Sequence, residues 1–183
     1  MRKKAVMAAM VVTLALAQST AAFASGSSSS RSVVVQATNT ANTLGKSGNE
    51  ATIGDTRVTF VQGEKDAVAG LPEATANIIT SINKGAELST LKTGLDLTGY
   101  KSLNGTRAVM TYKAGTKIEK TGDVKMDFYV PNLVDGLGTV QVLFYNNMTG
   151  RWQLLQPNAI DTKTKMLTVT LPNSGTISVV YKK

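Results

Sequence analysis

The sequence predicts a mainly β fold, an antiparallel β-sandwich of about seven strands with one short helix towards its N-terminal end. Two observations predict this fold. Apolar and polar side chains alternate along most of residues 92–183, and turn residues interrupt the alternation every ~8–12 residues. One earlier segment, residues 72–84, has instead the apolar spacing of a helix. We therefore expect two antiparallel sheets with a small helical addition.

The start of the chain has the pattern of a signal peptide, assigned to residues 1–24. Residues 2–4 are basic, residues 5–17 are mainly apolar, and Ala22-Phe23-Ala24 places small residues before a cleavage site. We expect cleavage between Ala24 and Ser25 and a secreted, extracellular mature chain. The apolar run, about 13 residues, is too short for a ~30 Å hydrocarbon layer, so no membrane span is expected in the mature chain.

Residues 25–50 are predicted to form a flexible leader, because they are rich in Ser, Thr, Asn and Gly and have little to bury. The β-branched triplet Val33-Val34-Val35 interrupts this composition. It could form a strand within its own domain, add a strand to a sheet edge of another copy, or remain unpaired. All three alternatives stay open.

Residues 51–91 are predicted to contribute one strand, over residues 56–62, and one amphipathic helix that packs on the sandwich. Pro72 suits the first turn of that helix, and Glu73 complements the positive end of the helix dipole. Gly85 is suited to end it.

Residues 92–183 are predicted to form the sandwich itself. In the clearest strand, Val124, Met126 and Phe128 share one face and Lys125 lies on the other, which is typical of a strand with one side in water. The same alternation predicts strands at residues 140–144, 152–154, 167–171 and 177–181, with less regular ones at 95–103 and 107–112.

Four segments carry a family resemblance: Val130-Pro131-Asn132-Leu133, Val140 to Tyr145, Thr149-Gly150-Arg151-Trp152, and Ser174 to Tyr181. Over about 50 residues they resemble the C-terminal half of small immunoglobulin-like or fibronectin-like sandwich modules of secreted bacterial surface proteins. The resemblance implies an immunoglobulin-like β-sandwich and a binding, adhesive or spacing role at a cell envelope. It implies no catalytic residue.

The composition excludes several kinds of chemistry. The chain has no Cys and no His, so disulfides, thiolate nucleophiles, Cys/His zinc sites and His-based triads are impossible. No cofactor, metal site or catalytic residue is expected. The carboxylates of Asp123 and Asp127 would lie about 13 Å apart on one strand face, beyond the ~5–9.5 Å of paired glycosidase carboxylates. A carboxylate-based hydrolase is therefore the least favoured alternative.

The expected contact surface combines tyrosines with basic side chains. Trp152 is instead expected in the core, on one face with Leu154 and opposite Phe144. The residues expected to face a partner are Tyr129, Tyr145, Arg151, Lys113, Lys117, Lys120 and Lys125. Such a basic rim attracts anionic polymers in a salt-sensitive way, although lysines also protect exposed sheet edges from aggregation.

These features favour a secreted, non-catalytic binding or adhesion module at the extracellular face. The formal net charge is +8 for the whole chain, and about +5 without the three basic residues of the signal peptide. The expected partner is a glycan, a cell-wall polymer or a protein on a host or cell surface, and not a nucleic acid. The alternative is a structural subunit that assembles through residues 33–35. The sequence does not fix the oligomeric state.

Overall fold

The computed structural model describes residues 44–183. The expected signal peptide, most of the predicted leader and the Val33–Val35 triplet lie outside the described residues. The described helices and strands, in chain order, are β1 (Glu50–Ile53), β2 (Thr56–Phe60), α1 (Glu64–Ala67), α2 (Glu73–Asn83), η1 (Leu88–Thr90), β3 (Tyr100–Ser102), β4 (Arg107–Lys113), β5 (Val124–Tyr129), β6 (Thr139–Asn146), β7 (Arg151–Leu155), β8 (Ala159–Asp161), β9 (Met166–Leu171) and β10 (Gly175–Lys182).

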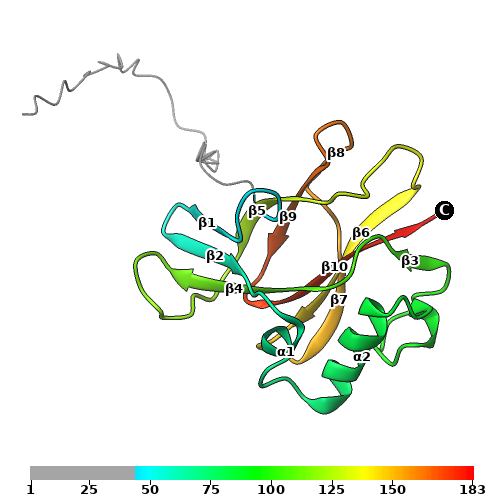
Figure 1. Ribbon diagram of the computed structural model, residues 1–183, viewed down its shortest axis with the longest axis horizontal. Coiled ribbons are helices and arrows are strands. Elements are labelled where there is room, and N and C mark those ends of the chain that lie inside the picture. Colours follow the sequence, from blue (N-terminus) through cyan, green and yellow to red (C-terminus); the bar gives the residue numbers. More distant parts are fainter. Residues whose placement is uncertain (1–43) are drawn as a thin grey trace, which may run out of the picture. The chain divides into compact units, whose positions relative to one another are not determined.

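The strands form two antiparallel sheets (Figure 1). The larger, seven-stranded sheet has the order β1-β2-β4-β10-β6-β7, with β3 also paired to β10. The smaller sheet has the order β5-β9-β8. β10 therefore lies at the centre of the larger sheet, where it pairs with β3, β4 and β6. None of the described helices is both long enough and apolar enough to cross a membrane.

The main core lies between the two sheets. Apolar side chains from β2, β4, β6 and β10 of the larger sheet pack against those from β5 and β9 of the smaller one. Phe60 of β2 and Phe128 of β5 meet edge to face, with ring centres 6.0 Å apart. Phe128 is completely buried, and Phe60 is 2% exposed. This burial gives the two sheets a shared hydrophobic interior.

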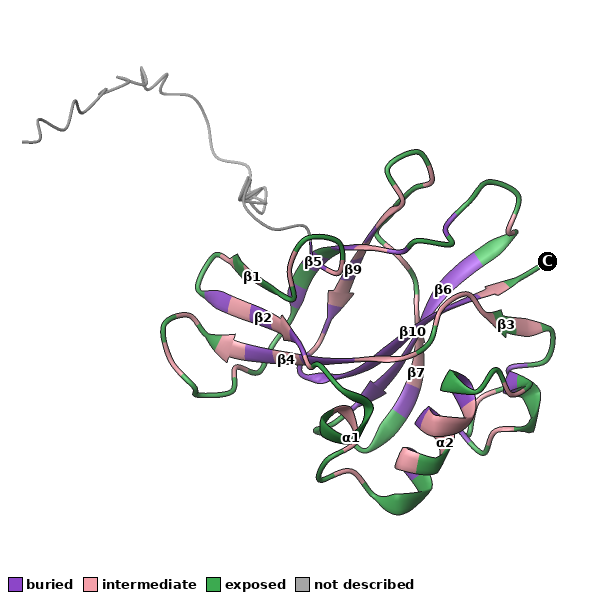
Figure 2. Cartoon of the chain, viewed as in Figure 1, coloured by how far each residue is buried: buried purple, intermediate pink, exposed green. Residues whose placement is uncertain are grey.

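A second core lies on the other face of the larger sheet, beneath α2 and η1 (Figure 2). Ile79 and Ile82 of α2 pack with Leu143 of β6 and Val180 of β10. The helix lies within residues 72–84, where the sequence predicts it. Asn83 ties its end to the sheet, since its Oδ1 accepts hydrogen bonds from the backbone N–H (2.7 Å) and hydroxyl (3.0 Å) of Thr106.

Part of the predicted leader belongs to the fold. Leu44 is 1% exposed and lies in the main core, although the sequence places it in a polar stretch. Its carbonyl accepts the backbone N–H of Tyr129 at 2.9 Å, and Glu50 already begins β1. The leader boundary at residue 50 was therefore too late, because a single apolar residue can be anchored by contacts remote in sequence.

Ser174 supplies a buried polar link next to β10. Its hydroxyl accepts the backbone N–H of Thr111 at 3.1 Å, and the Thr111 hydroxyl donates to the carbonyl of Lys120 at 2.7 Å. Both Ser174 and Thr111 are at most 1% exposed.

We expect Ser174→Ala to lower the free energy of unfolding by about 1–3 kcal/mol, because it leaves the buried Thr111 N–H without an acceptor. Urea unfolding measures the change. Ser89→Ala is the matched control, since that exposed hydroxyl bonds only the Glu87 carboxylate, and it should cost less than about 0.5 kcal/mol. Equal losses in the two variants would contradict the assigned role.

Candidate functional site

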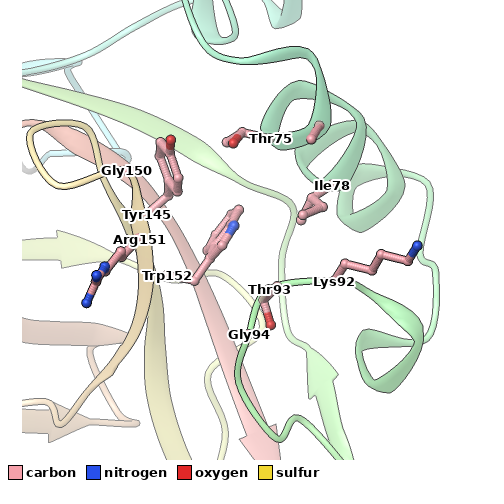
Figure 3. A pocket seen from close by; sticks show the side chains of 10 residues that line it. Thr75, Ile78, Lys92, Thr93, Gly94, Tyr145, Gly150, Arg151 and Trp152 are labelled. Carbon is pink, nitrogen blue, oxygen red and sulfur yellow. The ribbon is translucent and has the colours of Figure 1, made fainter.

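A groove with a volume of about 380 Å³ lies between α2 and the β6–β7 hairpin (Figure 3). One wall is formed by Ala74, Thr75 and Ile78 of α2. The opposite wall is formed by Tyr145 of β6 and residues 150–152, and the segment 92–94 closes one end.

The aromatic wall follows from the pairing of β6 with β7. The register places Tyr145 directly opposite Trp152, and the two ring centres are 5.2 Å apart. Both side chains point to the helix-covered face of the sheet and belong to the second core. Tyr145 is 4% exposed and Trp152 is 7% exposed. The groove is thus built on two rings that the surrounding core holds in place.

Three polar atoms at the groove lack a hydrogen-bond partner among the described residues. They are the Tyr145 hydroxyl, the Trp152 indole N–H and the Thr75 hydroxyl, each on a side chain at least nine-tenths buried. The Thr93 hydroxyl, by contrast, accepts the backbone N–H of Leu95 at 3.3 Å. Among the described residues, the side-chain atoms that are both fully buried and without a partner are Arg57 Nε and Asn173 Oδ1, so the three groove atoms are open to solvent and can bond water or a ligand.

The charged groups at the groove are all cationic. Lys92 and Arg151 are exposed, and in Figure 3 they lie on opposite sides of Trp152 with their side chains extended outwards. Neither forms an ion pair within the part of the chain that the structure describes. No carboxylate belongs to the groove lining. The groove therefore presents uncompensated positive charge to a ligand.

Only two residues of the expected contact surface lie at the groove. Tyr145 and Arg151 line it, whereas Tyr129 and the four lysines lie on β4, on β5 or in the connection between them. In the larger sheet β10 and β6 separate β4 from β7, a spacing of about 14 Å across three strand intervals. The seven residues therefore do not form one surface.

The expected orientation of Tyr145 was wrong. We predicted a wet outer face for it and a core position for Trp152 opposite Phe144. The register instead pairs Phe144 with Gln153 and Tyr145 with Trp152. Trp152 is buried as predicted and shares its face with Leu154, but that face is the one beneath α2. Tyr145 is buried there too, because β6 is covered on both sides.

The predicted basic rim is partly neutralised. Lys120 pairs with the Asp55 carboxylate and also donates to the Thr56 hydroxyl at 2.8 Å. The Lys120 ammonium beside it holds the pKa of Asp55 below its usual value, first through the hydrogen bond and then through charge. The Tyr129 ring lies under the Lys46 ammonium, which is 5.4 Å from the ring centre. The exposed members of the rim are Lys113, Lys117 and Lys125.

The carboxylates weighed for catalysis lie apart from the groove. Asp127 accepts the Thr168 hydroxyl at 2.6 Å on the small sheet. Among residues 44–183, no three His, Cys, Asp or Glu side chains come close enough together to hold a metal ion.

Sequence reasoning missed Thr75 and Lys92 as site residues. The helical pattern indicates that the α2 segment packs on a sheet, but no short-range signal indicates which strands it covers. The continuous apolar run from Val142 to Tyr145 was the available signal, since such runs are typical of strands buried on both faces. With that reading, Tyr145 would be expected in the interior and not on a face in contact with water.

Comparison with known proteins found no matching family model, no matching characterised protein and no matching solved structure.

Proposed function

We propose that the protein is a secreted, non-catalytic binding module at the extracellular face and that it binds a glycan in the groove between α2 and β7. The observation that carries this proposal is the set of three unpartnered polar atoms on Thr75, Tyr145 and Trp152. A ligand rich in hydroxyl groups would satisfy all three atoms, and a saccharide is such a ligand.

The size and lining of the groove support a small polar ligand. Its volume of about 380 Å³ is within the 300–1,000 Å³ typical of ligand pockets. Ile78 and the edges of the two aromatic rings supply apolar contact, and the hydroxyl and indole groups supply direction. Since Trp152 is only 7% exposed, we propose contact through its N–H edge rather than stacking on the ring face.

We propose binding rather than catalysis because the groove lining contains no carboxylate, thiol or imidazole to act as acid, base or nucleophile. An adhesive or spacing role at a cell envelope and an immunoglobulin-like class for the sandwich remain predictions from the family resemblance. Two sheets with a shared core favour that class. The division into seven and three strands differs from the four and three of a constant immunoglobulin domain.

We expect Tyr145→Phe and Thr75→Val each to weaken glycan binding roughly threefold to tenfold, because each removes one hydrogen-bonding group and keeps the side-chain shape. Affinity electrophoresis of the exported chain in gels containing glycans measures the change. Tyr129→Phe is the matched control, since it removes the same group outside the groove.

Failure of every tested glycan to retard the unmodified chain would overturn the proposed function. If Tyr129→Phe and Tyr145→Phe weaken glycan binding equally, the groove is not the binding site. Urea unfolding of each variant shows whether the fold itself has changed.

A further inference from the structure

The polar side chains of the groove are mainly hydrogen-bond donors. Lys92, Arg151 and the Trp152 indole can only donate, whereas the hydroxyls of Thr75 and Tyr145 can donate or accept. No side chain of the lining can only accept. This set matches a ligand whose groups are predominantly acceptors, and carboxylate and sulfate oxygens are the strongest acceptors that saccharides carry.

The charge at the groove points the same way. The two ion pairs that the described residues form, Arg57 with Glu50 and Lys120 with Asp55, leave Lys92 and Arg151 uncompensated. Glu73 precedes the lining residue Ala74 and is the only acidic residue directly next to the lining in the sequence. Both cations are exposed, on long side chains that no ion pair among the described residues holds in place.

We propose that the groove selects saccharides bearing a carboxylate or sulfate group, with the anion held by Arg151 and Lys92 and the sugar hydroxyls by Thr75 and Tyr145. This inference rests on the proposed function and specifies its ligand class. Because the two cations are at the rim and the hydroxyls are inside, the neutral part of the sugar enters the groove and the acidic group stays at its mouth.

The chain supplies its own reporter for this proposal. Trp152 is the single tryptophan of the sequence and lines the groove, so a bound ligand changes the only indole emission. The exported chain is titrated separately with sialyllactose and with lactose. The two saccharides differ by one sugar, which bears a carboxylate. It is titrated in parallel with sulfated galactose against galactose, which separates sulfate from carboxylate as the source of the anion.

We expect the acidic member of at least one pair to bind roughly tenfold more tightly than its neutral partner, with an advantage that shrinks as salt is added. Arg151→Gln and Lys92→Gln should each remove most of that advantage. Lys117→Gln is the matched control, since it removes the same charge from an exposed lysine in the connection from β4 to β5.

The outcomes separate the two proposals. Equal affinity for acidic and neutral partners overturns the selection of anions and leaves glycan binding standing. No change in emission with any saccharide, together with no retardation in glycan gels, overturns the proposed function itself. If Lys117→Gln reduces the acidic advantage as much as Arg151→Gln does, the anion is held by general surface charge, and its assignment to the groove is overturned.

Discussion

Gly175→Ala is expected to destabilise the fold by about 3 kcal/mol, because overpacking a well-packed interior costs that much. Gly175 begins β10 and faces both Asn146 of β6 and Val109 of β4. A Cβ atom at this position would lie 2.1 Å from the carbonyl oxygen of Tyr145 and 2.3 Å from the Phe144 ring. The carbonyl belongs to the backbone of a paired strand, so the clash is relieved only if β6 and β10 separate.

The matched control is Gly70→Ala. Gly70 has a φ of +77° but no atom within 4 Å of the added Cβ, so it tests backbone strain without a clash. Backbone strain alone should lower the free energy of unfolding of Gly70→Ala by about 1–2 kcal/mol. Urea unfolding followed by Trp152 emission compares both variants with the unmodified chain. A loss for Gly175→Ala no larger than that for Gly70→Ala would contradict the close approach of β6 and β10.

Phe128→Ala is expected to lower the free energy of unfolding by about 3–5 kcal/mol, the usual cost of deleting a buried Phe side chain. Phe128 is completely buried, and its ring meets Phe60 across the interface between the two sheets. The deletion therefore removes buried apolar area and also an aromatic contact. Such a contact contributes about 0.5–1.5 kcal/mol to stability beyond the burial of its area.

Ile118→Ala provides the comparison, since Ile118 is 67% exposed and should change the free energy of unfolding by less than about 0.5 kcal/mol. The double variant with Phe60→Ala measures the coupling between the rings, because the losses of contacting residues are not additive. Additive losses would show that the two sheets are not joined through this ring contact.

The strands with one wet side could be predicted from the sequence. β5 places Val124, Met126 and Phe128 in the core and leaves Lys125 and Asp127 exposed, as their alternation indicates. Two short strands escaped prediction. β1 (Glu50–Ile53) and β8 (Ala159–Asp161) lie at sheet edges and bury little, so their side chains carry weak periodicity.

The site could be predicted only in part. The sequence predicts Tyr145 and Arg151 as contact residues, but it places them on an exposed sheet face together with lysines that are distant in the structure. Their actual neighbours Thr75 and Lys92 come from segments more than 50 residues earlier in the chain. The docking of α2 brings them together, and it depends on contacts such as that between Asn83 and Thr106. One sequence shows that a helix is amphipathic, but not which strands it will cover.

The position of β10 sets the order in which the larger sheet can close. Among the described strands, β10 alone joins β4 on one side to β6 on the other. Both of those strands precede Gly175–Lys182 in the chain, so until β10 pairs, the larger sheet exists as two parts with unsatisfied edges. Closure then requires pairing between segments far apart in sequence, which slows folding and exposes partly folded chains to aggregation.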